Sequence, residues 1–120
     1  MLNKTKQLGN WGESLIAKFL EEQKFVILER NYQTRWGEID LIAKKGDIIA
    51  FVEVKTRKVS YFPISNTITQ SKQRKLIRTA QLYAQKKNLL EYVLRFDVAT
   101  ITMQHNSHNI TYLPNAFQKQ

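Results

Sequence analysis

The chain has no cysteine, and its 120 residues include only four glycines, two prolines and two histidines. Without cysteine there is no disulfide, no thiolate metal site and no cysteine nucleophile. The glycines are too scattered to form a phosphate-binding loop. The two histidines lie in the sequence His105-Asn-Ser-His108, which is typical of a turn and has no third metal ligand nearby. These absences exclude thiol chemistry and leave oxygen donors as the available ligands.

Long apolar runs are also missing. No stretch of 18 or more apolar residues occurs, so no membrane span is predicted. The basic N-terminus, MLNKTKQLGNWGES, is not followed by the apolar core of a signal peptide. We therefore expect a cytoplasmic protein with one domain over residues 1–113 and a C-terminal tail over residues 114–120.

Charge of one sign is concentrated in a single part of the chain. The net charge is +9, and residues 54–90 contain no acidic residue. The basic residues of that span are Lys55, Arg57, Lys58, Lys72, Arg74, Lys75, Arg78, Lys86 and Lys87. This asymmetry favours a polyanionic partner, and a charged face that serves only solubility is the alternative.

Hydrophobic periodicity predicts the order of helices and strands. Apolar residues at helical spacing predict a helix that begins at Asn10, as its N-cap, and a second helix over residues 70–87. The predicted strands are residues 25–32, 36–43, 48–57, 94–102 and a short edge strand over 110–113. The order indicates an α/β domain in which helices cover a mixed sheet.

Acidic residues interrupt the two central strands, where a core strand would carry apolar residues. A two-residue loop at Gly46-Asp47 would place Asp40 directly opposite Glu53, whereas a three-residue loop would break this pairing. Like charges in that position destabilise a sheet, and a divalent cation is the obvious compensation. The alternative is that Glu53 pairs with Lys55 on the surface and Asp40 is solvated.

A divalent ion at this acidic pair would have a definite chemistry. Oxygen ligands suit Mg²⁺ or Mn²⁺, and an ion held by Asp40 and Glu53 would polarise a phosphodiester and lower the pKa of a bound water. Lys55 shares a strand face with Glu53 and could orient that water. Glu13, at the edge of the apolar stripe of the first helix, adds a ligand if that helix packs on the hairpin. Otherwise it is a first-turn glutamate that favours the helix dipole.

The start of the second helix is unusually basic. Lys72, Arg74 and Lys75 lie in its first turns, where the helix dipole favours acidic residues. An anion docked at this helix start, where free N–H groups point outward, would offset that cost.

The acidic pattern is similar to the signature of the PD-(D/E)XK nuclease superfamily. It consists of Asp40, a twelve-residue gap and Glu53-Val54-Lys55. Longer segments, which cover about residues 9–98, resemble the YraN family of small bacterial endonuclease-like proteins: GNWGESLIAKFL, ILERNYQTRWGEIDLIA, FVEVKTR, KQRKLIRTAQLY and RFDV. The resemblance implies a restriction-endonuclease-like αβββαβ core with a central mixed sheet, related in shape to archaeal Holliday-junction resolvases.

The resemblance also implies roles for individual residues. The matched positions are Glu13 as the helix glutamate, Asp40 and Glu53 as metal carboxylates and Lys55 as the catalytic lysine. The backbone carbonyl of Val54 would be a further ligand. Ile39 stands where the superfamily has proline, and this departure does little to weaken the metal assignment.

The implied activity is Mg²⁺- or Mn²⁺-dependent hydrolysis of phosphodiester bonds in DNA, including branched or structured DNA. The alternative is a catalytically inactive binding module of a DNA- or RNA-processing complex. A homodimer stays open, because resolvase-like relatives cut junctions that have two symmetric sites. The residues expected to bind nucleic acid are Arg57, Lys58, Lys72, Arg74, Lys75 and Arg78.

Overall fold

Five strands form one mixed sheet in the order in which they occur along the chain. In this computed structural model, which describes residues 4–58 and 68–119, the elements are α1 (Lys4–Glu22), β1 (Val26–Thr34), β2 (Gly37–Lys45), β3 (Ile48–Arg57), α2 (Gln70–Lys86), β4 (Val93–Gln104) and β5 (Ser107–Phe117). Strands β3 and β4 are parallel and all other neighbours are antiparallel. Helix α2 lies in the long connection that a parallel pair requires. The predicted α/β fold with an αβββαβ core is confirmed.

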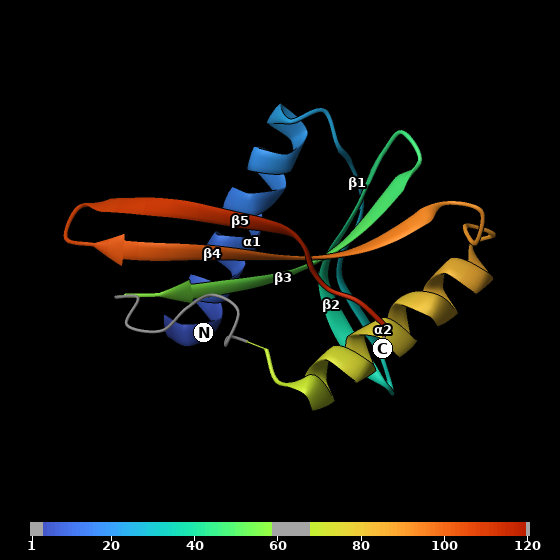
Figure 1. Ribbon diagram of the computed structural model, residues 1–120. Coiled ribbons are helices and arrows are strands. Elements are labelled where there is room, and N and C mark those ends of the chain that lie inside the picture. The colour runs from blue at the N-terminus through green and yellow to red at the C-terminus, as the bar shows by residue number, and fades with distance from the viewer. Residues whose placement is uncertain (1–3, 59–67, 120) are drawn as a thin grey trace.

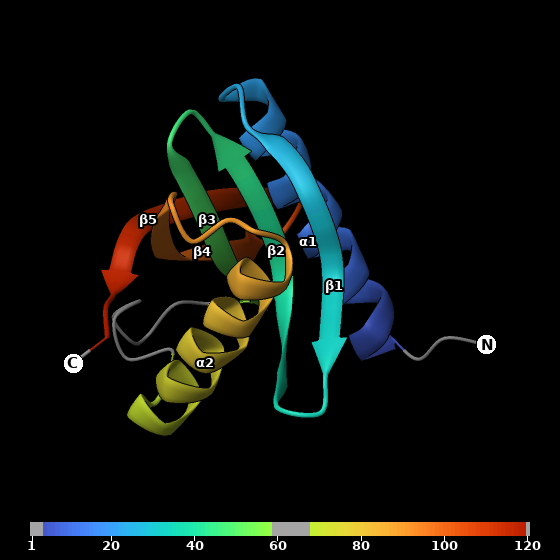
Figure 2. The same cartoon turned by 90° about the vertical axis from the view of Figure 1, so that its right-hand side faces the viewer.

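The two helices lie on opposite faces of the twisted sheet (Figures 1 and 2). On one face, the α2 residues Leu76, Ile77, Ala80 and Tyr83 form an apolar cluster with side chains of β2, β3 and β4. On the other face, the α1 residues Ile16, Ala17 and Leu20 pack on the alternate residues of the same strands. The central strands are therefore buried on both sides, which explains their nearly continuous apolar sequences.

The central hairpin has the predicted two-residue loop. Strands β2 and β3 pair from Lys45↔Ile48 to Leu41↔Val52, so only Gly46 and Asp47 lie between them. Gly46 has a positive φ of +57°, as the first position of a type II′ turn requires. This register brings Asp40 and Glu53 to the same end of the hairpin.

Helix α1 begins at Lys4, so the prediction of a start at Asn10 is wrong. Residues 4–10 include no proline, and the single Gly9 costs only about 1 kcal/mol in a helix interior. This cost is too small to stop the helix. The earlier start adds almost two turns ahead of Glu13.

Strand β5 is longer than the predicted edge strand, and it continues to Phe117, past the boundary expected at residue 113. A bulge opposite Phe96 and Val98 takes up the extra residues. Asp97, which is fully buried, anchors this bulge by accepting hydrogen bonds from the Asn115 backbone N–H, the Tyr112 hydroxyl and the Arg95 guanidinium. The tail prediction missed this anchor because it depends on a contact between two strands.

Neither helix in the described part of the chain is long and apolar enough to cross a membrane.

Candidate functional site

Strand β2 turns about its own axis at Asp40. Ile39 packs on the α2 face of the sheet, whereas Leu41, only two residues later, packs on the α1 face. In a regular strand residues two apart share a face. Across on β1, Asn31 lies between the pairs Arg30↔Leu41 and Tyr32↔Ile39 and has a positive φ of 53°. The sheet is therefore irregular around Asp40 on both strands.

The Asp40 carboxylate replaces a backbone hydrogen bond between β2 and β3. The backbone pairing stops at Leu41↔Val52, and Asp40 Oδ2 instead accepts a hydrogen bond of 2.8 Å from the Val54 backbone N–H. Asp40 and Glu53 are thus neighbours at a fork between the strands. This differs from the ideal cross-strand pair that the sequence predicts.

The fork is an unfavourable place for two negative charges. Burial, and then the charge of the neighbouring Glu53, raise the pKa of Asp40 to about 7, although the hydrogen bond from Val54 opposes the shift. Near neutral pH a large fraction of the Asp40 carboxyls therefore carry a proton. A cation at this point would stabilise the ionised carboxylate.

Two lysines share one oxygen of Glu53, whose residue is only 6% exposed. Lys72 Nζ lies 2.6 Å from Glu53 Oε1, and Lys55 Nζ lies 3.5 Å from the same atom. Burial lowers the pKa of the Lys72 ammonium, but the bond and charge of Glu53 outweigh this, so the pKa is raised overall. The Lys72 ammonium thus places a positive charge beside Asp40 and Glu53.

Glu13 approaches the same point from α1, on the other face of the sheet. Burial raises its pKa, while side-chain hydrogen bonds to Asn31 and Asp40 lower it. Its Oε1 is buried and has no hydrogen-bond partner among the residues that the structure describes. Gly12 lets the helix come this close, because a Cβ there would lie 2.3 Å from Thr56 Oγ1 on β3. The irregularity at Asp40 therefore brings side chains from both helices together.

The structure thus gathers Glu13, Asp40, Glu53 and Lys55 at one fork. The described residues nevertheless contain no group of three or more His, Cys, Asp and Glu side chains arranged to hold a metal ion. The carboxylates of Asp40 and Glu53 and the Glu13 oxygen Oε1 are separate potential metal ligands. The Lys72 ammonium already forms an ion pair with Glu53.

The six basic residues predicted to bind nucleic acid do not form one surface. Lys72 and Lys75 line a pocket of about 360 Å³ beside Glu53, together with Gly37, Glu38, Thr69, Ser71 and Leu76. Arg74 and Arg78 line a different pocket on α2. Arg57 and Lys58 lie at the end of β3, and the buried Nε of Arg57 has no hydrogen-bond partner in the described part of the chain.

Sequence reasoning missed two contributions to the site. Asn31 lies within the strand that the sequence predicts over residues 25–32, although asparagine tolerates the positive φ that it has here. The contact of Lys72 with phosphate stays a prediction, and the structure adds a contact with Glu53 that the sequence does not predict. Thr69 caps α2 by accepting the Lys72 backbone N–H at 3.1 Å, which fixes the start of α2 beside the fork. The three-residue spacing of Thr69 and Lys72 was the available signal.

Comparisons with known proteins agree on one family. A family model described as "Uncharacterised protein family UPF0102" matches residues 12–101. The chain is 42% identical over 114 residues to the UPF0102 protein of Geobacter metallireducens, covering 94% of this chain and 93% of that relative. It is 45% identical over 114 residues to the UPF0102 protein of Alkaliphilus metalliredigens, covering 94% and 99%. The chain therefore belongs to the UPF0102 family, the YraN family that its sequence motifs resemble.

Proposed function

We propose that this protein is a nuclease that uses Mg²⁺ or Mn²⁺ to hydrolyse phosphodiester bonds in DNA. The observation that supports this most is the fork itself, where Asp40 and Glu53 are held close enough, and buried enough, to raise the pKa of Asp40 to about 7. Proteins place like charges together in this way chiefly at sites that bind or transform a ligand.

The donor set fits a small hard cation. Asp40, Glu53 and the Val54 carbonyl offer only oxygen, and within the described ranges 4–58 and 68–119 the buried Oε1 of Glu13 has no hydrogen-bond partner. Mg²⁺ commonly uses one or two carboxylates and completes its shell with water and phosphate oxygens, so a third carboxylate is not required. When bound, the ion would supply Lewis-acid polarisation of the phosphate and a more acidic water.

The lysines would supply the remaining chemistry. Lys55 Nζ, 3.5 Å from Glu53 Oε1, would either orient the attacking water or neutralise the charge that develops on the phosphate oxygens. Lys72 has a side chain that is 42% exposed, so its ammonium can leave Glu53 and meet a phosphate in the adjoining pocket. Lys75 lines that pocket and would bind the phosphate backbone of the DNA.

A cleavage assay tests this proposal. Labelled linear, flapped, gapped and four-way DNA would be incubated with the protein and Mn²⁺, and with Asp40→Asn and Glu53→Gln variants. We expect cutting by the wild type and a loss of at least a hundredfold in each variant. Asp47→Asn, which changes the exposed hairpin loop, is the matched control and should cut normally. Equal cutting by all variants, or by none including the wild type, would contradict the proposal.

One observation favours a second function, namely a nucleic-acid-binding module without turnover. The Lys72 ammonium already pairs with Glu53 without a metal. A module of this kind would bind DNA or RNA in EDTA, with strong salt dependence. It would show no cleavage on any substrate with any divalent ion.

A further inference from the structure

Helix α2 carries a second basic pocket, on the flank that faces away from the fork. This pocket, the α2 groove, has a volume of about 440 Å³ and is lined by Gln70, Gln73, Arg74, Ile77, Arg78, Gln81, Gln118 and Lys119. At 100° per residue, Arg74 lies about 160° around the helix from Lys72. The α2 groove and the pocket beside Glu53 therefore lie on different sides of one helix.

No acidic side chain among the described residues pairs with the cations of the α2 groove. Three of its lining residues are cationic and none is acidic, and α2 has no acidic residue along its whole length. The ion pairs formed by Lys55, Lys72 and Arg95 do not involve the cations of the groove. Arg74 and Lys119 thus present their charge to solvent and to any anion that enters, and the Arg78 guanidinium lies over the Trp36 ring with no carboxylate partner among the described residues.

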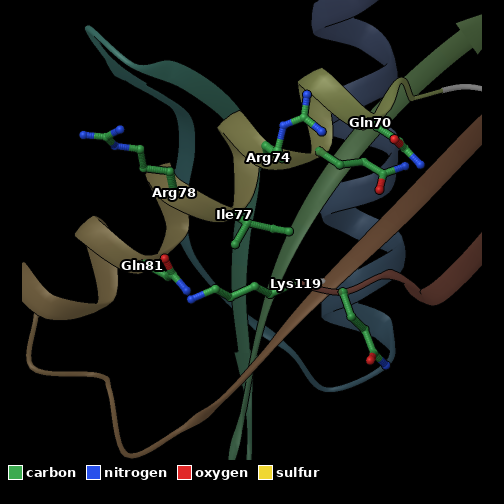
Figure 3. Close-up of a pocket in the computed structure, with 8 residues that line it drawn as sticks. Gln70, Arg74, Ile77, Arg78, Gln81 and Lys119 are labelled. Carbon is green, nitrogen blue, oxygen red and sulfur yellow. The ribbon is translucent and has the colours of Figure 1, made fainter.

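The walls of the α2 groove suit more than a phosphate. Ile77, which is buried, provides an apolar floor, and Figure 3 shows Lys119 extending from the C-terminal segment alongside Ile77 toward Gln81. Glutamine amides donate and accept hydrogen bonds, so they can pair with the edges of different bases. An apolar floor with amides and cations at its rim matches one unpaired nucleotide, whose base is accessible.

An exposed tryptophan connects the two pockets. Arg78 lies 4.2 Å from the centre of the Trp36 ring, and Arg35 lies 4.7 Å from it. Trp36 itself is 40% exposed, and the next residue, Gly37, lines the pocket beside Glu53. A strand that leaves the fork would therefore meet a cation–aromatic surface and then the α2 groove.

We propose that the α2 groove binds an unpaired nucleic-acid strand, contacting its phosphates through Arg74, Arg78 and Lys119 and one base over Ile77. This inference rests on the proposed function, because it takes the strand held there as an extension of the strand at Glu53. A duplex keeps its bases stacked inside and cannot use the apolar floor. Binding in the groove needs no divalent ion.

The test is binding of a fluorescein-labelled single-stranded oligonucleotide in EDTA, measured by anisotropy over a range of salt concentrations. The doubly substituted variant Arg74→Gln/Lys119→Gln removes two phosphate contacts. The slope of log K against log salt should then fall by about 1.4, because each contact on a single strand contributes about 0.7. Affinity at 0.1 M salt should fall on the order of tenfold.

The matched control is Lys18→Gln/Lys24→Gln, which removes the same charge from exposed positions on α1 and the turn after it. It should change the slope little. A second readout uses Trp11→Phe, which leaves Trp36 as the only tryptophan. The emission of Trp36 should change when the strand binds, and the change should be lost in the groove variant.

Three results would overturn the inference. They are a groove variant that behaves like the control, a blunt duplex that competes as well as the single strand, and a wild type that does not bind the oligonucleotide. Cleavage of any substrate that depends on Asp40 would in each case leave the proposed nuclease function standing. If Asp40-dependent cleavage is also absent, the nuclease proposal fails separately.

Discussion

Substitution of Asp40 by asparagine is predicted to stabilise the protein at high pH. Asparagine keeps the oxygen that can accept the Val54 N–H, and it cannot ionise. In the wild type, burial and then Glu53 raise the pKa of Asp40 from 3.8 to about 7. The folded state therefore binds more protons than the unfolded state between these two pH values, and its stability falls as pH rises through that window.

The size of the effect follows from the shift. A carboxyl whose pKa rises from 3.8 to about 7 opposes folding by up to about 4 kcal/mol once it is ionised. Part of that penalty is shared with Glu53, so we expect the variant to gain about 2 kcal/mol over the wild type at pH 8. For a domain of this size, that corresponds to a rise of about 8 °C in Tm. At pH 4 the side chain is uncharged in both folded proteins, and the two should differ little.

Thermal unfolding from pH 4 to pH 8, in EDTA and in Mg²⁺, provides the assay. In EDTA the Tm of Asp40→Asn should rise relative to the wild type as pH increases. At pH 8, Mg²⁺ at ten times its Kd should stabilise the wild type by about 1.4 kcal/mol and leave the variant unchanged. Asp47→Asn, at an exposed position, controls for the loss of a carboxylate.

The reasoning would be refuted if the curves of Asp40→Asn and the wild type stayed parallel over the whole range in EDTA. Ionisation of Asp40 would then not destabilise the folded protein, and no cation would be required to stabilise the carboxylates at the fork. A stabilisation by Mg²⁺ that is equal in both proteins would place the ion elsewhere.

Three further substitutions test other contacts. Lys72→Met removes the cation that occupies Glu53, so Mn²⁺ should bind several-fold more tightly by calorimetry than to a Lys75→Met control; weaker binding would show that Lys72 does not compete with the ion. Gly12→Ala should lower the free energy of unfolding in urea by about 1–3 kcal/mol, because its Cβ would collide with Thr56 on β3. Gly9→Ala, with open space around it, should instead raise it by up to about 1 kcal/mol. Asp97→Ala should cost about 3–5 kcal/mol, because it leaves Arg95 without its partner in a largely buried site; a loss below 1 kcal/mol would contradict the anchoring role.

Local chemistry explains which parts of the fold could be predicted from the sequence. The Gly46-Asp47 loop fixes the register of the central hairpin through two residues, so the approach of Asp40 to Glu53 was predictable. The α2 helix was predicted nearly to the residue, because its apolar period is regular and Thr69 caps it.

The rest of the site depends on contacts between distant segments. The twist at Asp40 requires Asn31 on another strand, and the approach of Glu13 requires Gly12 to pack against β3. The α2 groove needs Lys119, which the sequence suggested was part of a tail. No local pattern signals that the C-terminal segment returns to α2.

The irregularity at Asp40 also has a consequence for how parts of the sheet open. The backbone pairing of β2 with β3 runs from Lys45 to Leu41, so the far half of the β1–β2 hairpin is tied to β3 by the Asp40 side chain rather than by backbone hydrogen bonds. Amide hydrogens of residues 34–39 should exchange with solvent faster than those of residues 41–45. The outer half of the β1–β2 hairpin, with Trp36 at its tip, would then move relative to β3 about Asp40. An ion bound at Asp40 would restrict this motion.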